Sequence, residues 1–586
     1  MKWKKRTVGI LIFFSLMMLV LIGRLMQIQL VSTESFTDKH INLLEKSVMQ
    51  RTHSVVLDDG RGHFVDRHGE PLSDDSSPSL ILFPFLKNMK WPAQQVAAIL
   101  QVKEQELLEQ VEHSTTPFLF EHEAKVLRLT QKQVDDVNKI GVPGIVAANA
   151  RLKDEHILAE HLVGITGQNA KEIEKRYQDK LQEGKITVAS PIGISGLQRS
   201  FDEFLLTDGE AKLLYHVDRQ GEPIFGKNVK YTHPANPFYP VSIQTTIQKA
   251  LQTKAEELLK QFPIEKGGLV LLDVKTSEIL AMASLPSLRT ASYEEAARNQ
   301  MLTPGFPGSV FKTVIAAAAI DQGLLTQGRM FDCNTNPYGE ESAEHPMGSL
   351  SFTDSFARSC NRTFADIGQE LMKKDRNIFE KYAKLLGMDG TVGWKGDVFH
   401  FTNFHQLYQE GEGTIWAGEK DKTVRKAIAQ TSIGQKDVKL SPLAVANMMA
   451  TIARGGQALE VKAVREITYK NGTKLYHFPE HKLPQTMKKE TVQQLGGLLR
   501  QVVTAPNGTG AMFQTLPLAV AGKSGTAQTG KDNRLNHWFA GYFPYDNPRY
   551  ALVVVDLETA KPSSPTKQIF AEYVKAIAAW EQEAQR

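Results

Sequence analysis

Residues 307–312 of this chain are Pro307-Gly308-Ser309-Val310-Phe311-Lys312, and an alanine-rich apolar run follows over 314–320. Proline and glycine interrupt the chain before Ser309, and the pattern after it predicts a helix that begins at or just after this serine. Residues three apart on a helix share a face, with Cβ atoms roughly 5–6 Å apart. The spacing therefore predicts that Ser309 Oγ and the Lys312 amine meet at a helix N-terminus, where a serine beside a base can act as a nucleophile.

The Ser-x-x-Lys spacing is a weak signal by itself, because about two matches are expected by chance in a chain of this length. The second match, Ser564 to Lys567, contains Pro565 and leaves little chain after it to supply partner residues. A helix start with an exposed lysine explains either match equally well. Other motifs must therefore distinguish a nucleophile from an ordinary helix start.

Two further short motifs follow in the chain. Ser359-Cys360-Asn361 is the only Ser-x-Asn, and Lys523-Ser524-Gly525-Thr526 is the only Lys-[Ser/Thr]-Gly. Ser359 could instead cap a helix, and Lys523 could be a surface charge on a strand. A phosphate-binding loop ending at Ser524 is excluded, because Pro517 stands where that loop needs glycine and a strand pattern follows where it needs a helix.

Composition indicates a folded protein with more than one domain. The chain has 586 residues, 41% hydrophobic and 23% charged, with 69 lysines and arginines against 65 acidic residues. This near balance does not favour a nucleic-acid partner. His156 and His161 lack the His-Glu-x-x-His pattern, so no metal site is expected. Cys333 and Cys360 suit an exported protein, and the sequence leaves open whether they are bridged.

The first thirty residues predict a membrane anchor. Four basic residues within 2–6 precede an uncharged run over 7–23, which Arg24 closes. This length is at the lower limit for crossing a bilayer, and 25–31 extend it if Arg24 reaches the interface. Basic residues before the run predict a cytoplasmic N-terminus and an extracytoplasmic remainder. A cleavable signal peptide is the alternative, although no small-x-small cleavage site follows the run.

Beyond the anchor, the sequence predicts two extracytoplasmic parts separated by a linker-like stretch over 226–240. We expect a cytoplasmic tail at 1–7, the transmembrane anchor at 8–30, a non-catalytic pedestal at 31–235 and a main domain at 241–586. The predicted fold class is α+β and multidomain, with an elongated pedestal of strands and helices before an antiparallel sheet covered by helices and a helical lobe. The expected elements of the main domain are a helix over 247–262, a strand pair over 267–283, strands over 518–529, 537–544 and 550–557, and a closing helix over 568–584.

Taken together and in order, the three motifs resemble those of the penicillin-recognising serine enzymes. The surrounding sequence narrows the resemblance to a class B (monofunctional) penicillin-binding protein, a peptidoglycan D,D-transpeptidase, and it covers nearly the whole chain. Further matching stretches are Arg61-Gly62 through Gly69, Ser195 to Gln198, and Ile433-Gly434-Gln435. His68 stands where asparagine is usual and Gln198 where glutamate is usual, both outside the catalytic region. No glycosyltransferase module is recognised before residue 260, which argues against the bifunctional class A type.

The resemblance implies a catalytic role for five side chains. Ser309 would attack the penultimate D-Ala of a D-Ala-D-Ala stem peptide, and a neutral Lys312 would accept its proton. Burial and the nearby charge of Lys523 would lower the Lys312 pKa. Ser359 would relay a proton to the leaving amine, while Asn361 would hold Lys312 and the substrate amide.

The resemblance also implies how substrate is held. The hydroxyls of Ser524 and Thr526, with Lys523, would bind the terminal carboxylate, and Gly525 would let substrate approach the strand edge. The backbone N–H groups of Ser309 and Thr526 would form the oxyanion hole.

Partners and location follow from the same resemblance: stem peptides, β-lactams, the lipid bilayer and other membrane proteins of cell-wall synthesis, at a bacterial cell membrane crossed once. No cofactor is expected. A D,D-carboxypeptidase would use the same residues with water as acceptor. A class A β-lactamase would need a deacylating Glu-x-x-Leu-Asn between the second and third motifs, which the chain lacks. A non-enzymatic binding or scaffold protein is the remaining alternative.

Overall fold

The computed structural model describes residues 2–33, 42–73, 76–151, 157–183, 186–207, 209–218, 229–232, 236–288, 298–341, 346–530 and 532–584. The chain divides into two compact units. The first unit is 1–60, 75–153 and 208–236, and the second is 61–74, 154–207 and 237–586. Residues 226–228 and 233–235 of the expected linker lie outside the described residues. The domain limits at 235 and 241 stay a prediction.

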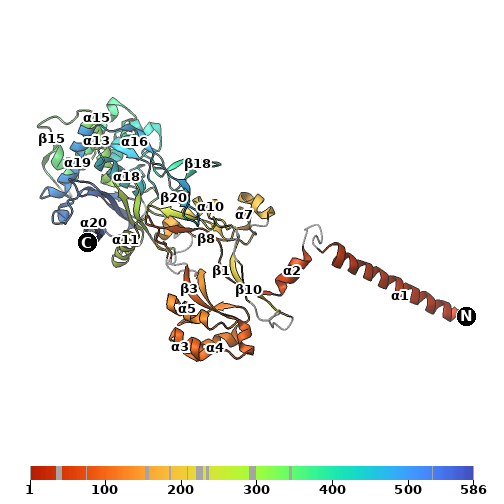
Figure 1. Cartoon of the computed structure of the whole chain (residues 1–586). Helices are drawn as coiled ribbons and strands as arrows, with labels where there is room; N and C mark the ends of the chain where they lie inside the picture. The colour runs from red at the N-terminus through yellow and green to blue at the C-terminus, as the bar shows by residue number, and fades with distance from the viewer. Residues whose placement is uncertain are drawn as a thin grey trace. The chain divides into compact units, whose positions relative to one another are not determined.

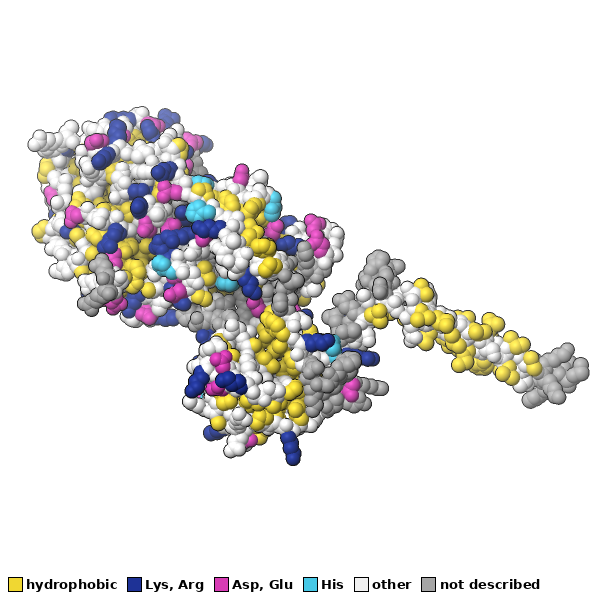
Figure 2. Space-filling model, viewed as in Figure 1, with side chains coloured by type: hydrophobic (Ala, Val, Ile, Leu, Met, Phe, Trp, Pro, Cys, Tyr) yellow, Lys and Arg dark blue, Asp and Glu magenta, His cyan; other side chains and the backbone are white. Residues whose placement is uncertain are grey.

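The chain begins with a long apolar helix. α1 spans Lys2–Met26 and continues as a π-helix over Gln27–Val31. Its apolar side chains are exposed, and Figure 2 shows them as a hydrophobic band along the helix. In the described part of the chain this is the one helix, over Arg6–Val31, that is long and apolar enough to cross a bilayer. The expected apolar N-terminal helix is confirmed, and it fits a membrane anchor.

The first unit contains two three-stranded sheets and a layer of short helices. The sheets are β1 (Thr52–Asp58), β10 (Ala211–His216) and β11 (Lys230–Thr232), and β4 (Phe118–Leu119), β3 (Ser76–Leu82) and β7 (Ile145–Arg151). The helices are α3 (Ala93–Leu100), α4 (Glu104–His113) and α5 (Gln131–Lys139). Leu80 and Leu82 of β3 share an apolar core with these helices, so the apolar face of each helix packs on this sheet.

The second unit is built on a five-stranded antiparallel sheet. Its strands in spatial order are β14 (Ile279–Leu285), β13 (Gly267–Asp273), β25 (Tyr550–Thr559), β24 (Leu535–Phe543) and β23 (Ala521–Gln528). The sheet thus combines two strands that precede the helical lobe with three that follow it, and β13 pairs with β25 where the two groups meet. The predicted antiparallel sheet is confirmed.

Helices cover both faces of this sheet, as Figure 1 shows. They are α11 (Lys249–Gln261) and α20 (Thr566–Ala584) on one face, and α18 (Pro442–Ala453) on the other. α13 (Lys312–Asp321) packs against other helices of the lobe. Successive residues of a strand point to opposite faces, so Leu269 and Leu271 pack with α11 and α20. Val270 and Leu272 pack with the helical lobe. A continuous apolar strand pattern is therefore the correct signal for a sheet buried on both faces.

The helical lobe surrounds α18, which is buried on nearly all sides. Its start follows from local chemistry, because Ser441 Oγ accepts a hydrogen bond from Ala444 N and Pro442 occupies the first helical position. The other helices of the lobe are α14 (Phe352–Arg358), α15 (Asn361–Lys374), α16 (Ile378–Leu385), α17 (Arg425–Ser432) and α19 (Lys489–Thr504).

The segment 61–74 belongs to the second unit because it joins a sheet there. β2 (His63–Val65) runs parallel to β12 (Ser242–Thr245), and the sheet continues through β20 (Val464–Thr468) and β21 (Lys474–His477). This parallel pairing joins residues far apart in the sequence, so local patterns gave no sign of it.

Both residues that depart from the resembled family pattern make structural contacts. Gln198 Oε1 accepts a hydrogen bond from Arg61 Nη2 at 2.7 Å, and Arg61 also pairs with buried Asp202 at 2.8 Å. His68 Nε2 lies 3.0 Å from Gln248 Oε1. Gln198 and His68 therefore each have a polar partner within the second unit.

Candidate active site

Ser309 lies on a tight turn that packs closely against the backbone of strand β23. Gly308–Phe311 form a 3-10 turn that leads directly into α13, so Lys312 is the first residue of the α-helix. Gly308 has φ of +54°, and a Cβ there would come within 2.2 Å of Thr526 O on β23. Only glycine permits this approach. In the described part of the chain, half-buried Ser309 makes no side-chain hydrogen bond, so its hydroxyl is available. Its expected contact with the Lys312 amine therefore stays a prediction.

The second motif holds the amine of Lys312. Ser359 ends α14 in the left-handed conformation, with φ of 63°, and Asn361 begins α15. Lys312 Nζ donates to Asn361 Oδ1 at 2.6 Å, to Ser359 O at 2.8 Å and to Ser359 Oγ at 3.2 Å. Cys360, between these two residues, forms a disulfide with Cys333, which settles the question that the sequence left open.

The third motif brings a second lysine to the same hydroxyl. Lys523 Nζ, from edge strand β23, donates to Ser359 Oγ at 2.9 Å and to Ser524 O at 3.1 Å. Ser359 Oγ therefore lies between the amines of Lys312 and Lys523. Three segments separated by 50 and 164 residues in the sequence converge on one side of the sheet.

Both lysines are fully buried, each with none of its surface exposed to solvent. Burial lowers the pKa of Lys312 well below its ordinary value, and the charge of Lys523 lowers it further. Burial, with the charge of Lys567, lowers the pKa of Lys523 to about 7. Among the described residues no carboxylate forms an ion pair with either amine. A neutral Lys312 is the form that can accept a proton from a serine.

The edge of β23 faces the turn that carries Ser309. Thr526 O lies against Gly308, and the N–H and C=O of one strand residue point to the same side. The Thr526 N–H therefore points toward the Ser309 turn, as an oxyanion donor requires. A Cβ on Gly525 would come within 2.5 Å of Pro307 O, so this glycine is needed for close packing of turn and strand. Its expected role toward substrate stays a prediction.

Two residues that the sequence analysis did not select also lie here. Thr509 Oγ1 accepts a hydrogen bond from Ser524 Oγ at 2.8 Å, and Thr509 O accepts one from Lys567 Nζ at 2.8 Å. Lys567 belongs to the second Ser-x-x-Lys match, which was set aside for lack of partners. Its position beside the sheet follows from α20 packing on the sheet, which no local pattern indicates. Thr509 is in a glycine-rich turn and carries no sequence signal of its own.

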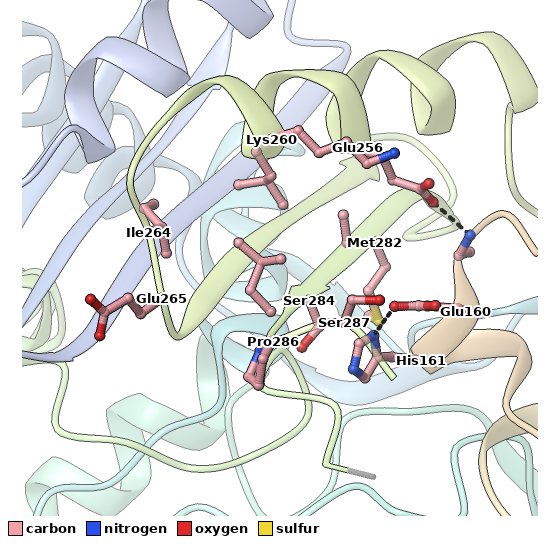
Figure 3. A pocket seen from close by; sticks show the side chains of 14 residues that line it. Glu160, His161, Glu256, Lys260, Ile264, Glu265, Met282, Ser284, Pro286 and Ser287 are labelled. Atoms are coloured by element: carbon pink, nitrogen blue, oxygen red, sulfur yellow. Dashed lines mark hydrogen bonds and ion pairs between the residues drawn. The ribbon is translucent and has the colours of Figure 1, made fainter. Parts of the chain in front are cut away.

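A separate pocket of about 450 Å³ borders β14, at the opposite edge of the sheet from β23. Figure 3 shows Glu160 and Glu256 at one end of it and Lys260 on the helix above. Both carboxylates accept hydrogen bonds from backbone N–H groups, at 3.0 Å and 2.8 Å. Lys260 is exposed to solvent, so this pocket lacks the buried lysine that could activate a serine. Of these two regions, the β23 edge is the one whose buried lysines could support nucleophilic chemistry.

Two family descriptions match this chain. The description of the penicillin binding protein transpeptidase domain matches residues 267–575, more than half of the chain. The description of the penicillin-binding protein dimerisation domain matches 58–239. Together they cover the two regions that carry the motifs and the matching stretches named above.

Several curated proteins are similar to this chain. It is 27% identical to Peptidoglycan D,D-transpeptidase MrdA of Haemophilus influenzae over 445 residues, which are 68% of this chain and 65% of that protein. It is 23% identical to Peptidoglycan D,D-transpeptidase FtsI of Escherichia coli over 562 residues, 91% of this chain and 84% of that protein. The matched region thus spans just under two thirds of the length of MrdA.

A solved structure described as "Structural coordination of polymerization and crosslinking by a peptidoglycan synthase complex" has the same fold. It superposes with a TM-score of 0.61 over 98% of both chains, at 20% sequence identity. At this identity the likeness concerns the fold alone. The chain belongs to the penicillin-binding proteins, in the class B group that joins a dimerisation domain to a transpeptidase domain.

Proposed function

We propose that this protein is a membrane-anchored peptidoglycan D,D-transpeptidase, which cross-links stem peptides through an acyl-enzyme on Ser309. One observation carries the proposal: Ser359 Oγ receives hydrogen bonds from two fully buried lysines, Lys312 and Lys523, on the side of β23 that faces Ser309. A nucleophile, a base of lowered pKa and a proton relay are the groups that acyl transfer needs. The names of the similar proteins MrdA and FtsI support the reaction class.

The first half of the proposed reaction forms the acyl-enzyme. Ser309 Oγ attacks the carbonyl carbon of the penultimate D-Ala while its proton passes to neutral Lys312. The bond from that carbon to the amide nitrogen of the last D-Ala then breaks. Lys312 returns the proton through Ser359 Oγ to the leaving amine, and free D-Ala departs. The hydrogen bonds between the two lysines and Ser359 support this relay.

The second half reverses these roles. An amine of a neighbouring stem peptide attacks the ester carbon, gives up a proton through the same relay, and releases Ser309 as the new amide bond forms. In both halves the N–H groups of Ser309 and Thr526 would stabilise the oxyanion. Removing one such donor typically slows catalysis on the order of 10²–10³-fold.

Substrate binding would use the same edge of the sheet. Lys523, with the hydroxyls of Ser524 and Thr526, would hold the terminal carboxylate of the donor peptide. A β-lactam carries a carboxylate next to its reactive amide and would acylate Ser309 in the same way. Ser524 and Thr526 are on β23 two residues apart, so both point to the same face of the strand.

The anchor gives the proposed topology. We infer that 1–7 lie in the cytoplasm, that 8–30 cross the membrane once, and that the pedestal at 31–235 and the transpeptidase domain at 241–586 are extracytoplasmic. Other membrane proteins of cell-wall synthesis are the proposed partners of the pedestal. The fold shared with a chain of a peptidoglycan synthase complex supports this partner class.

A fluorescent penicillin tests the proposal on the full-length chain in detergent. We expect stable covalent labelling that maps to Ser309 by mass spectrometry and is lost in Ser309→Ala. Ser564→Ala, in the other Ser-x-x-Lys match, is the matched control and should still label. Rapid release of the label would indicate a β-lactamase, and absence of labelling in the wild type would indicate a scaffold.

Transfer is separated from hydrolysis with a thioester analogue of the stem peptide. With a D-amino acid present, the proposed enzyme should form the transfer product in preference to the free acid. Hydrolysis alone, whatever the acceptor concentration, would identify a D,D-carboxypeptidase instead.

A further inference from the structure

Two residues outside the motifs, Thr509 and Lys567, are connected to the Lys523 motif by hydrogen bonds. We propose that Lys567 and Thr509 are positioning residues for the donor's terminal carboxylate: Lys567 fixes Thr509, Thr509 fixes the Ser524 hydroxyl, and the Lys567 ammonium adds positive charge to the carboxylate site. This inference rests on the proposed transpeptidase function and names how that site selects a donor that ends in a free carboxylate.

Lys567 is an incompletely paired cation at the start of α20. It is half-buried, and its Nζ donates to Thr509 O at 2.8 Å. An ammonium group has three N–H donors, and this bond uses one of them. Among the described residues no carboxylate forms an ion pair with Lys567. Burying a charge is costly unless it is paired, so this ammonium is suited to an anion that arrives with a ligand.

Thr509 connects three parts of the site through three different atoms. Its N–H donates to Ala357 O at 3.1 Å, two residues before Ser359. Its Oγ1 accepts from Ser524 Oγ at 2.8 Å, and its carbonyl accepts from Lys567. A shift of Thr509 would therefore move the Ser524 hydroxyl and the end of α14 together. This arrangement makes Thr509 the mechanical link between Lys567 and the motif residues.

Electrostatics gives the site its preference for an anion. Lys312, Lys523 and Lys567 place three amines in one region, and no acidic side chain in the described part of the chain forms an ion pair with any of them. The charge of Lys567 reaches Lys523, since it lowers the pKa of that lysine. Burial lowers the pKa of Lys567 itself. A bound carboxylate would offset this repulsion and favour the charged form of both Lys523 and Lys567.

The position of this charge suits a peptide carboxylate. In a donor ending in D-Ala-D-Ala, the terminal carboxylate belongs to the residue directly after the scissile carbonyl, about 3.8 Å further along the chain. The carbonyl must reach Ser309, so the carboxylate falls on the neighbouring β23 edge, where Ser524 is hydrogen-bonded to Thr509. When the carboxylate binds, the single Ser524 proton turns to it and the Thr509 hydroxyl donates to Ser524 Oγ in return. An ester or amide in place of the carboxylate would lose its attraction to Lys567.

The test compares two thioester donors, one with a free terminal carboxylate and one with its methyl ester, on the full-length chain. Lys567→Met should lower kcat/KM for the free carboxylate about 10-fold, mainly through KM, which is the range of one charge-assisted hydrogen bond. The methyl ester should react at an unchanged rate. Lys567→Arg, which keeps the charge, should retain most of the activity.

Thr509 is tested by the same pair of donors. Thr509→Val removes the hydroxyl that holds Ser524 and should also weaken the carboxylate donor selectively, while Thr509→Ser should restore it. Lys575→Met is the matched control, because Lys575 is an exposed lysine on the same helix, paired with Glu572. It should leave both donors unaffected.

Two results would overturn the inference. Equal losses for both donors in Lys567→Met would mean that the residue only supports the fold, and no loss for either would mean that it takes no part. In both cases the wild type would still acylate on Ser309, so the proposed function would stand. If the wild type fails to acylate with any donor or penicillin, the proposed function fails first, and the inference falls with it.

Discussion

The second unit contains two clusters of basic side chains that differ in one respect. In the Glu278 cluster, one buried carboxylate pairs with Arg465 at 2.6 Å, Arg67 at 3.3 Å and Lys462 at 3.6 Å. In the lysine cluster of the candidate active site, formed by Lys312, Lys523 and Lys567, the structure shows no ion pair with any described carboxylate. The basic groups are similar, and only the first cluster holds an anion of its own.

The difference shows in the direction of the pKa shifts. Burial alone would raise the pKa of Glu278, but the hydrogen bond and charge of Arg465, with Lys462 and Arg67, outweigh it and hold the pKa below its usual value. In the lysine cluster nothing offsets burial, so the pKa of Lys312 falls well below its usual value. A neutralised cluster stabilises the fold, whereas an uncompensated one supplies a base and attracts anions.

The largest expected effect follows from removing the base. Lys312→Gln should slow acylation by penicillin about 10²–10⁴-fold, the usual contribution of general base catalysis. The free energy of unfolding should not fall, because the substitution removes a buried basic group that has no carboxylate partner among the described residues. Stopped-flow acylation and thermal unfolding of the same preparation measure the two quantities. Normal acylation in a folded Lys312→Gln protein would contradict the role of this base.

A substitution in the Glu278 cluster should have the opposite pattern of effects, on stability and not on acylation. Glu278→Gln should lower the free energy of unfolding by about 3 kcal/mol, because it leaves three basic groups without their buried partner. Acylation by the protein that remains folded should change little. Glu257→Gln is the control, since its exposed pair with Lys254 is expected to contribute less than about 0.5 kcal/mol. Equal stability losses in the two variants would remove the distinction between the clusters.

A smaller effect is expected at Ser359, the hydroxyl between Lys312 and Lys523. Ser359→Ala should slow acylation on the order of 10²-fold, because the proton relay and the acceptor of both lysines are lost. Ser359→Gly removes the same hydroxyl but fits the left-handed backbone without strain. The two variants should be equally slow. A fast glycine variant would show that the backbone shape at this residue matters and its hydroxyl does not.

The smallest effect is a change in the pH dependence of stability. Lys523 has a folded pKa of about 7 against 10.5 when unfolded, so between these values the unfolded chain binds more protons. Stability should therefore rise with pH across this range, by at most about 1.4 kcal/mol per pH unit for this group. Lys523→Met should be more stable at pH 7 and show a flatter rise between pH 7 and 10.

The Glu278 cluster should respond at the other end of the pH scale. Its carboxylate has a lowered pKa, so its contribution is present above pH 4.5 and is lost as pH falls through the lowered value. Chemical denaturation of the full-length chain at a series of pH values measures both trends. Identical pH profiles for wild type and Lys523→Met would contradict the lowered pKa of Lys523.

Much of the fold was predictable because the signals were local. Apolar strand patterns identified β13, β14 and β25, and amphipathic spacing identified α11. The closing helix expected over 568–584 is α20. The three motifs of the candidate site were also short patterns, and the order in which they occur outweighed the chance frequency of each. These predictions needed no knowledge of which segments meet.

The rest of the site depends on contacts between distant segments. Lys567 was set aside because its own neighbourhood lacked partners, yet its partner Thr509 is 58 residues away in the sequence. The Cys333–Cys360 disulfide and the Glu278 cluster likewise join segments that no local pattern relates. Such contacts are determined by sheet order and helix packing. Sequence patterns could therefore predict the motif residues but not Thr509 and Lys567, which are connected to them by hydrogen bonds from distant segments.

The most direct test of the account is the pH profile of Ser309 acylation. We predict that the second-order rate constant for penicillin reaches its plateau well below pH 10.5, because Lys312 is neutral far below the ordinary lysine pKa. A rate that climbs tenfold per pH unit up to about pH 10 would mean that Lys312 stays charged at neutral pH, and it would contradict the uncompensated lysine cluster as the source of the base.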